Sequence, residues 1–258
     1  MRPLALVTGA TRGIGHAIAH ALAPGHALVL TGRDREALDA AVEELRPLAH
    51  GPVNGLVCDL ADVADRDEFL RELGSLCDTL KTTVQVLVNN AGAAGSAPLA
   101  RTDDATWTGL MELNLHAPFA LTRALVPGMV RAGWGRVINI ASTAAIKGYA
   151  YTAAYSASKA GLVGLTRALA VELASKGVTV NAVCPGFTDT AIVARATENI
   201  TATTGRSVDE ARQTLAKFSP QNRLRHPDEV AGLVAYLASK AADGITGQAL
   251  AIDGGETA

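Results

Sequence analysis

The stretch "LALVTGATRGIGHAIAHALA", residues 4–23, decides the fold. Its first part is an apolar run typical of a strand buried on both faces, and its last part has the apolar spacing of a helix. Between them, "TGATRGIG" brings Gly9, Gly13 and Gly15 into the turn. Glycines let the backbone turn sharply and approach a ligand closely, and the helix that follows offers free N–H groups. This order indicates a site for the phosphates of a dinucleotide, with a tight turn that binds nothing as the alternative.

Strand and helix alternate along the rest of the chain. Further apolar runs predict strands near residues 26–33, 53–60, 84–92, 135–142, 178–186 and 247–255. Helical spacing is found at residues 34–48, 65–80, 103–115, 118–131, 152–176 and 226–242. The alternation predicts an α/β fold: one Rossmann-type domain over residues 1–258, with a doubly wound parallel sheet of about seven strands and helices on both faces.

The alternation is interrupted once, between residues 188 and 225. This segment contains "SVDE", in which Ser207 can cap a helix and Glu210 can reach back to it as a capping box. Doubly wound sheets bind ligands at the carboxyl ends of their strands. We therefore expect residues 188–225 to form a lid over a substrate.

Composition excludes several classes of protein. The net charge is −2 and no basic block marks a nucleic-acid surface. No run approaches the about 18 apolar residues of a membrane span, and "MRPLALVTGA" lacks the longer apolar core of a signal peptide. Three widely spaced cysteines indicate buried thiols in a reducing compartment. We expect a cytoplasmic protein without a nucleic-acid or membrane partner. The six histidines are scattered, and we expect no metal site.

The segment "GYAYTAAYSASKAG", residues 148–161, holds three of the four tyrosines. Tyr155 and Lys159 are four apart and therefore share one face of a predicted helix. An ammonium group favours the phenolate of a tyrosine, whose ordinary pKa of about 10 is too high for acid–base catalysis at neutral pH. Tyr155 is the candidate acid–base residue, whereas Tyr149 and Tyr151 are expected to pack or to line a substrate entrance.

Two further residues complete a pattern. Ser142 ends the predicted strand "GRVINIAS", thirteen residues before Tyr155, and Asn114 stands in the apolar helical segment "MELNLHAPF". With T-G-x-x-x-G-x-G and "NNAG", this arrangement resembles the short-chain dehydrogenase/reductase family over essentially the whole chain. The resemblance implies an NAD(P)(H)-dependent oxidoreductase that interconverts a ketone and a secondary alcohol.

The resemblance also implies roles for the four catalytic residues. Ser142 would position and polarise the carbonyl, and Tyr155 would transfer the proton. Lys159 would lower the pKa of Tyr155 and bind the nicotinamide ribose, and Asn114 would hold a water relay behind the lysine. The cofactor contacts that we expect are Gly9, Thr11, Arg12, Gly13, Ile14, Gly15, Arg33, Asp59, Leu60, Asn90, Ala91, Gly92, Tyr155, Lys159, Pro185, Gly186 and Thr188.

The second predicted strand ends in "LTGRD", which bears on the choice of cofactor. Gly32 stands where NAD-type sites carry an acidic residue, and Arg33 and Arg12 could bind a ribose 2′-phosphate. We therefore expect NADP(H). NAD(H) stays open, because Asp34 could bind the ribose instead of capping a helix. For Asp59, the alternative to a contact with the adenine is likewise a helix cap.

The segment "TGRSVDEARQTLAKFSPQNRL" before "HPDEVA" resembles bacterial family members that act on 3-oxoacyl or 3-hydroxyacyl thioesters of CoA or acyl carrier protein. "VINIASTAAIKG" is also similar to polyketide ketoreductases, and a free ketone or secondary alcohol is a further alternative. A nucleotide sensor with this fold would not need the four catalytic residues. In or near the lid, Arg195, Arg206 and Arg223 could contact a phosphate of a carrier-bound substrate or could be solvated surface. The resemblance implies a homotetramer built from the long helices beside the fifth strand.

Overall fold

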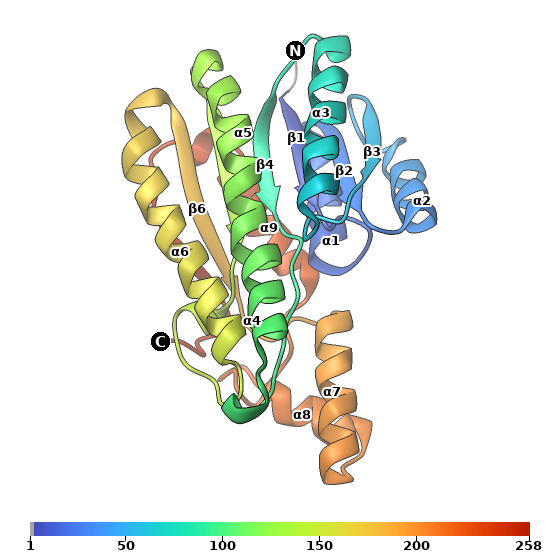
Figure 1. Ribbon diagram of the computed structural model, residues 1–258, viewed down its shortest axis with the longest axis vertical. Coiled ribbons are helices and arrows are strands. Elements are labelled where there is room, and N and C mark those ends of the chain that lie inside the picture. The colour runs from blue at the N-terminus through green and yellow to red at the C-terminus, as the bar shows by residue number, and fades with distance from the viewer. Residues whose placement is uncertain (1–2) are drawn as a thin grey trace.

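The computed structural model describes residues 3–258, so Met1 and Arg2 of the predicted domain lie outside the described residues. One parallel sheet of seven strands has the order β3-β2-β1-β4-β5-β6-β7, which confirms the predicted fold (Figure 1). The strands are β1 (Leu4–Thr8), β2 (Ala27–Gly32), β3 (Val53–Val57), β4 (Val84–Asn89), β5 (Gly135–Ile140), β6 (Val178–Pro185) and β7 (Ala249–Ile252). The strand order reverses between β1 and β4, and such a switch point opens a crevice at the carboxyl ends.

Helices cover both faces of the sheet. They are α1 (Gly13–Leu22), α2 (Arg35–Leu45), α3 (Val63–Leu80), α4 (Asp104–Met111), α5 (Ala117–Ala132), α6 (Ala153–Leu173), α7 (Ala191–Thr204), α8 (Val208–Ala216) and α9 (Pro227–Leu237). Alternate residues of β1 point to opposite faces: Ala5 and Val7 pack with α1, α2 and α9. Leu4 and Leu6 pack with α3, α5 and α6. Several strands are therefore largely apolar without a polar–apolar alternation because both faces are buried.

The helix starts largely follow the sequence. The side chain of Asp34 accepts a hydrogen bond from the N–H of Ala37 at 3.1 Å and caps α2. Ser207 and Glu210 form the predicted capping box at the start of α8. Asp62, and not Asp59, caps α3, so the alternative of Asp59 as a helix cap is wrong.

Two elements differ from the prediction. The helices expected at residues 103–115 and 118–131 are joined by a π-helical turn at Glu112–His116, which runs from α4 into α5. The structure also adds α7, which was not predicted. Its sequence "AIVARATENITATT" contains four threonines, whose β-branched side chains lower helix propensity.

The segment between β6 and β7 stands apart from the sheet. In Figure 1, α7 and α8 project beyond the carboxyl ends of the strands. Thr188 pairs with Arg225 in an isolated parallel bridge, so the two ends of the predicted lid lie side by side. Within residues 3–258, the helices fall short of the length and apolar character that crossing a membrane requires.

Candidate active site

The glycine-rich turn between β1 and α1 fits a pyrophosphate. Gly9 and Gly13 have φ of +63° and +58°, which L side chains rarely adopt. A Cβ on Gly15 would lie 2.2 Å from the carbonyl oxygen of Gly9, so the backbone packs too closely for any side chain there. Arg12, the residue before α1, is extended and gives no side-chain cap. The first N–H groups of α1 are therefore open to an anion, as the predicted dinucleotide requires.

The end of β4 fixes this turn. The side-chain amide of Asn90 donates hydrogen bonds to the carbonyl oxygens of Thr8 and Gly9, at 2.8 and 3.1 Å. The hydroxyl oxygen of Thr8 accepts from the N–H groups of Asn90 and Ala91, both at 2.9 Å. The sequence prediction missed this role of Thr8, although it directly precedes the first glycine. The amide of Asn90 therefore holds the turn, and its predicted contact with the adenosine stays a prediction.

The loop after β2 favours a phosphate over a bare ribose hydroxyl. A Cβ on Gly32 would lie 2.7 Å from the side chain of Thr11, so an acidic residue at position 32 would require Thr11 to move. Asp34 is engaged as the cap of α2. The side chain of Arg33 is 73% exposed, and its Nη1 lies 3.6 Å from a carboxylate oxygen of Asp59. This pair is exposed enough to open towards a ligand.

Three of the predicted catalytic residues meet at the carboxyl end of β5. Ser142 follows that strand, and it lies near enough to the phenol of Tyr155 on α6 to lower the pKa of that phenol. Lys159, one turn further along α6, is buried. Its Nζ donates to the carbonyl oxygen of Ile140 at 2.8 Å and lies 6.0 Å from the centre of the Tyr155 ring. A serine, a tyrosine and a lysine therefore converge on one side of the sheet edge.

Burial dominates the acid–base properties of this group. It raises the pKa of Tyr155, although Ser142 acts in the opposite direction. It lowers the pKa of Lys159 to about 8. The chain alone does not show the predicted lowering of the Tyr155 pKa, because burial has the largest effect and Lys159 is not among the groups that shift this pKa. A lowering that also needs the positive nicotinamide stays a prediction. The phenol stays protonated at neutral pH and is available as a proton donor.

Asn114 lies buried in the π-helical turn. Its Oδ1 accepts from the N–H of Ala93 at 3.0 Å, and its Nδ2 donates to the carbonyl oxygen of Ala93 at 2.9 Å and to the hydroxyl of Ser158 at 3.0 Å. A Cβ on Gly92 would lie 3.0 Å from this Oδ1 and 3.4 Å from Nζ of Lys159. Asn114 therefore ties the loop after β4 to α6, and the water relay stays a prediction. Ser158 has no signal in the sequence.

The loop after β6 contains the residues expected at the nicotinamide. Pro185 ends β6, and the hydroxyl of buried Thr188 donates to the carbonyl oxygen of Gly186 at 3.0 Å. A Cβ on Gly186 would lie 3.1 Å from the Cβ of Asp253, which keeps this position small. Cys184 is fully buried, and burial raises the pKa of its thiol to about 11. Burial and the raised pKa both disfavour the thiolate, the form in which a cysteine acts as a nucleophile.

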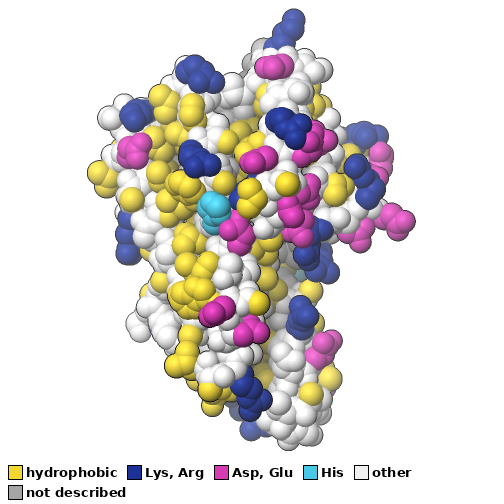
Figure 2. All heavy atoms as spheres, in the orientation of Figure 1, with side chains coloured by type: hydrophobic (Ala, Val, Ile, Leu, Met, Phe, Trp, Pro, Cys, Tyr) yellow, Lys and Arg dark blue, Asp and Glu magenta, His cyan; other side chains and the backbone are white. Residues whose placement is uncertain are grey.

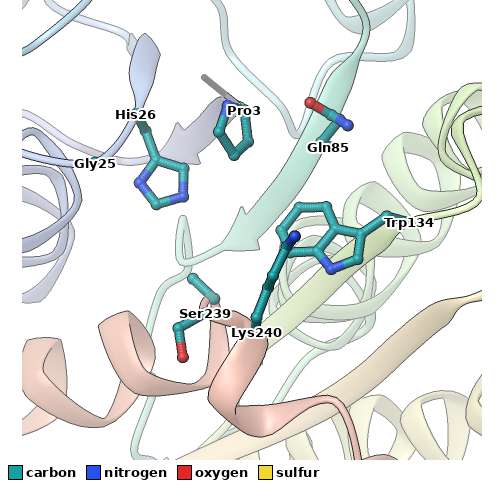
Figure 3. A pocket seen from close by; sticks show the side chains of 8 residues that line it. Pro3, Gly25, His26, Gln85, Trp134, Ser239 and Lys240 are labelled. Carbon is teal, nitrogen blue, oxygen red and sulfur yellow. The ribbon is translucent and has the colours of Figure 1, made fainter. Parts of the chain in front are cut away.

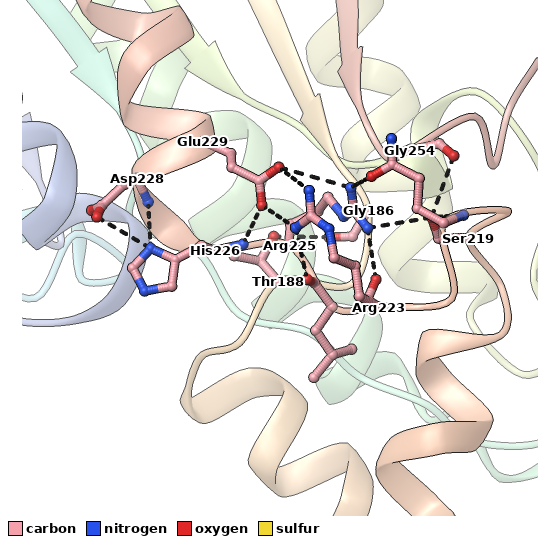
Figure 4. Close-up of polar contacts among 11 residues, drawn as sticks. Gly186, Thr188, Ser219, Arg223, Arg225, His226, Asp228, Glu229 and Gly254 are labelled. Carbon is pink, nitrogen blue, oxygen red and sulfur yellow. Dashed lines mark hydrogen bonds and ion pairs between the residues drawn. The ribbon is translucent and has the colours of Figure 1, made fainter.

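Arg225 supports this loop. The sequence analysis missed this role because the sequence around Arg225 does not distinguish it from the other arginines of the predicted lid. It is buried, and its guanidinium donates to the side chain of Gln221 at 2.5 Å and to the carbonyl oxygen of Arg223 at 2.8 Å (Figure 4). Its backbone pairs with Thr188. Arg223 instead donates two hydrogen bonds to Glu229, at 2.6 and 2.8 Å. Arg223 is therefore a poor candidate for a substrate phosphate.

Three aromatic rings, those of Tyr149, Phe187 and Phe218, lie close together beside the loop after β6. The ring of Tyr149 lies 6.0 Å from that of Phe187 and 5.8 Å from that of Phe218. Its hydroxyl donates to the hydroxyl of Thr143 at 2.7 Å. Tyr151 is 63% exposed and has φ of +67°. The structure thus gives the three tyrosines different environments, and Tyr155 is the one whose pKa responds to Ser142.

A hollow of about 440 Å³ lies at the opposite edge of the sheet (Figure 3). Its lining comes from residues that precede or begin strands, together with the segment after α9. These residues are Pro3, Gly25, His26, Gln85, Trp134, Ala238, Ser239 and Lys240. We assign the chemistry to the carboxyl edge, because parallel sheets bind ligands there and the Ser142–Tyr155 pair lies there.

Comparison with known proteins agrees with this geometry. The sequence model of the short chain dehydrogenase family matches residues 3–201. The chain is 42% identical over 257 residues to a protein named as a ketoacyl reductase of the granaticin polyketide synthase of Streptomyces violaceoruber, covering 98% of this chain and 93% of that one. It is 40% identical over 255 residues to the 3-oxoacyl-[acyl-carrier-protein] reductase of Synechocystis, covering 98% and 96%.

A crystal structure of a variant of actinorhodin polyketide ketoreductase with NADPH superimposes with a TM-score of 0.92 at 38% identity, covering 99% of this chain and 97% of that one. The chain therefore belongs to the short-chain dehydrogenase family. Its reaction class is the NAD(P)-dependent interconversion of a ketone and a secondary alcohol.

Proposed function

We propose that this protein reduces the ketone of a 3-oxoacyl thioester, of fatty-acid or polyketide type, to a secondary alcohol with NADPH. The observation that carries the proposal is the gathering of Ser142, Tyr155 and buried Lys159 at the carboxyl end of β5: Nζ of Lys159 lies 6.0 Å from the centre of the Tyr155 ring, and Ser142 is near enough to Tyr155 to lower its pKa. Two hydroxyl groups that converge on one point can both contact a carbonyl oxygen.

The protein's own groups have separate tasks in this reaction. The bound cofactor supplies the hydride. Tyr155 donates its phenolic proton to the oxygen that becomes the alcohol, and the raised pKa of Tyr155 keeps that proton in place until negative charge develops. Ser142 holds the same oxygen and orients the substrate. Lys159, anchored by the carbonyl oxygen of Ile140, presents its ammonium group to the nicotinamide ribose and stabilises the phenolate left on Tyr155.

The cofactor would lie along the crevice above β1 and β4. The N–H groups at the start of α1 hold the pyrophosphate, and Arg33 with Arg12 holds the 2′-phosphate. The capped Asp34 and the close approach of Gly32 to Thr11 support NADP(H) over NAD(H). The predicted contacts of Asp59, Leu60, Ala91, Gly92, Pro185, Gly186 and Thr188 belong to the same proposal.

The thioester is supported by the relatives and by the lid. A hollow of about 360 Å³ beside α8 is lined by Arg206, Thr214, Lys217 and Phe218. Arg206 donates to the hydroxyl of Thr214 at 3.2 Å and is exposed. Two cations beside an aromatic ring suit the phosphate and chain of a pantetheine arm. Of the lid arginines considered in the sequence, Arg206 is the one that we assign to this phosphate.

The test is NADPH consumption, followed by absorbance, with acetoacetyl-CoA and with acetoacetyl-N-acetylcysteamine, which has the same thioester but no phosphate. We expect both to be reduced, and we expect Arg206→Ala to raise the KM of the CoA thioester alone. Arg131→Ala, at the far end of α5, is the matched control and should change neither. Absence of turnover for both thioesters would overturn the substrate proposal. Turnover with NADH alone would overturn the choice of cofactor.

The predicted homotetramer is part of the proposal. Apolar side chains gather over α5 and α6 in Figure 2, and Val171 on α6 is 85% exposed. Covering this face with second copies would bury it. Light scattering coupled to gel filtration tests this: we expect the mass of four chains, and Val171→Glu should lower it. A monomeric mass for the unchanged protein would contradict the assembly.

A further inference from the structure

Two histidines and a glutamate meet on the outer surface between α1 and α2. His16 and His20 are four apart on α1, and Glu44 lies in the last turn of α2. Nε2 of His16 lies 3.2 Å from one carboxylate oxygen of Glu44, and Nε2 of His20 lies 2.8 Å from the other. The scattered histidines led us to expect no metal site, but His16 and His20 share a helix face because they are four residues apart.

The donor set and its dimensions match a metal site. The ligand atoms of His16, His20 and Glu44 all lie within 4.8 Å of one another. In a tetrahedral zinc site, bonds of about 2.0–2.1 Å put neighbouring ligand atoms about 3.3 Å apart. We propose that His16, His20 and Glu44 bind one Zn²⁺ or a similar first-row divalent ion, with a water molecule as the fourth ligand.

A second histidine–glutamate pair shows what makes this cluster different. His116 also lies within 2.8 Å of a glutamate, Glu112, four residues earlier. That carboxylate, however, accepts a hydrogen bond from buried Arg66, and the pair offers a single imidazole. At Glu44, two imidazoles face one carboxylate, and the three side chains are 27%, 37% and 52% exposed. An ion can therefore reach them from solvent by displacing only two hydrogen bonds.

The position of the site gives the ion a consequence. Helix α1 starts at the glycine-rich turn, and α2 starts directly after Arg33 and Asp34. An ion held by both helices would connect the two segments that we assign to the pyrophosphate and the 2′-phosphate. Because it binds the folded chain, it would also raise the melting temperature.

The test uses tag-free full-length protein, because a histidine tag would bind the same ions. Calorimetric titration with ZnCl₂ should show one equivalent bound, and Zn²⁺ should raise the melting temperature in a way that EDTA reverses. His20→Gln should weaken zinc binding by at least about tenfold, since changes behind a ligand already cost about 10–100-fold. His16→Gln should do the same, and His116→Gln should bind zinc like the unchanged protein.

Two further measurements make the outcome decisive. Co²⁺ should give the visible absorption of a tetrahedral site, and Mg²⁺, which prefers oxygen ligands, should not bind. The proposal is overturned if the unchanged protein binds no zinc. It is equally overturned if His16→Gln and His20→Gln both bind zinc as tightly as the unchanged protein does.

Discussion

The amino and carboxyl edges of the sheet, where the strands begin and end, differ in the partners of their buried cations, although glycines and hollows occur at both edges. At the amino edge, buried Arg136 pairs with Asp243 and stacks 4.3 Å from the ring of Trp134, so its charge is satisfied locally. At the carboxyl edge, the ammonium group of buried Lys159 donates a hydrogen bond to an uncharged group, the carbonyl oxygen of Ile140. The pKa of Lys159 falls to about 8. Burial lowers the pKa of Arg136 as well, so a shifted pKa does not separate the two edges. What separates them is that a serine, a tyrosine and a lysine lie close together at the carboxyl edge only, and a hollow alone does not mark a site.

The sharpest test of this comparison exchanges one tyrosine at each edge. Tyr155→Phe removes the proton donor and should lower kcat by about 10²–10⁴-fold or more. Tyr236→Phe, near the amino-edge hollow, removes only a hydroxyl 3.4 Å from the carbonyl oxygen of Ala241 and should leave kcat unchanged. Steady-state kinetics on both variants decides between the edges. Near-normal turnover by Tyr155→Phe would mean that the catalytic assignment of Tyr155 is wrong and that another group donates the proton.

A second pair of variants compares glycines. Gly15→Ala brings a methyl group to 2.2 Å from the carbonyl oxygen of Gly9 and should destabilise the protein by about 1–3 kcal/mol. Gly25→Ala, at the amino edge, meets only the carbonyl oxygen of Leu22 at 3.9 Å and should change stability by about 0.5 kcal/mol or less. Urea unfolding measures both, and fluorescence titration with NADPH should show weaker binding for Gly15→Ala alone. Equal stability of the two variants would contradict the tight packing of the turn.

A third comparison concerns cations. Arg33→Ala should weaken NADPH binding by roughly tenfold, which is the lower part of the range for a charge-assisted hydrogen bond because the side chain is exposed. NADH binding should change little. Lys240→Ala, which removes a cation at the amino edge, should affect neither cofactor. The measurement is the dissociation constant of each cofactor. An equal loss of affinity for NADPH and NADH would mean that Arg33 does not bind the 2′-phosphate.

The smallest expected effect is a pH dependence. The folded-state pKa of Lys159 is about 8, below the ordinary 10.5, so its ammonium form is complete well below pH 8 and is lost as the pH rises through 8. At pH 8 half of the ammonium is gone, and NADPH binding should be about twofold weaker than at pH 6. Lys159→Met should bind more weakly throughout and show no such step. If NADPH binding by the unchanged protein did not vary between pH 6 and 8, the charge of Lys159 would not contribute to cofactor binding.

The sheet and its helices could be predicted because they depend on periodicity, and Tyr155 and Lys159 were expected on one helix face because they are four residues apart. The cap at Asp34 and the capping box at Ser207 followed from short-range spacing in the same way. The place of Ser142 beside Tyr155 and Lys159 came from the resemblance to the short-chain dehydrogenase/reductase family. What the sequence analysis missed depends on long-range contacts. Arg225 is buried only because Thr188 and the chain after β7 pack around it, and helix α7 forms despite four threonines.

The histidine cluster shows a different limit. The spacing of His16 and His20 was visible in the sequence, but Glu44 is 24 residues further along the chain. Its place beside them depends on the packing of α2 against α1. The pKa of Tyr155 has the same dependence, since its direction is set by burial that no local pattern reveals.

The π-helical turn at Glu112–His116 changes the direction in which the side chains of α4 point relative to those of α5, although the helix continues through it. One extra residue per turn rotates everything on its amino side by about 100° relative to an uninterrupted α-helix. This lets α4 face α6 while α5 packs on β4 and β5. Deleting one residue from the turn would keep the helix but swing α4 out of step with α5. The orientation of α4 relative to α5 therefore depends on the number of residues in the turn rather than on any single side chain.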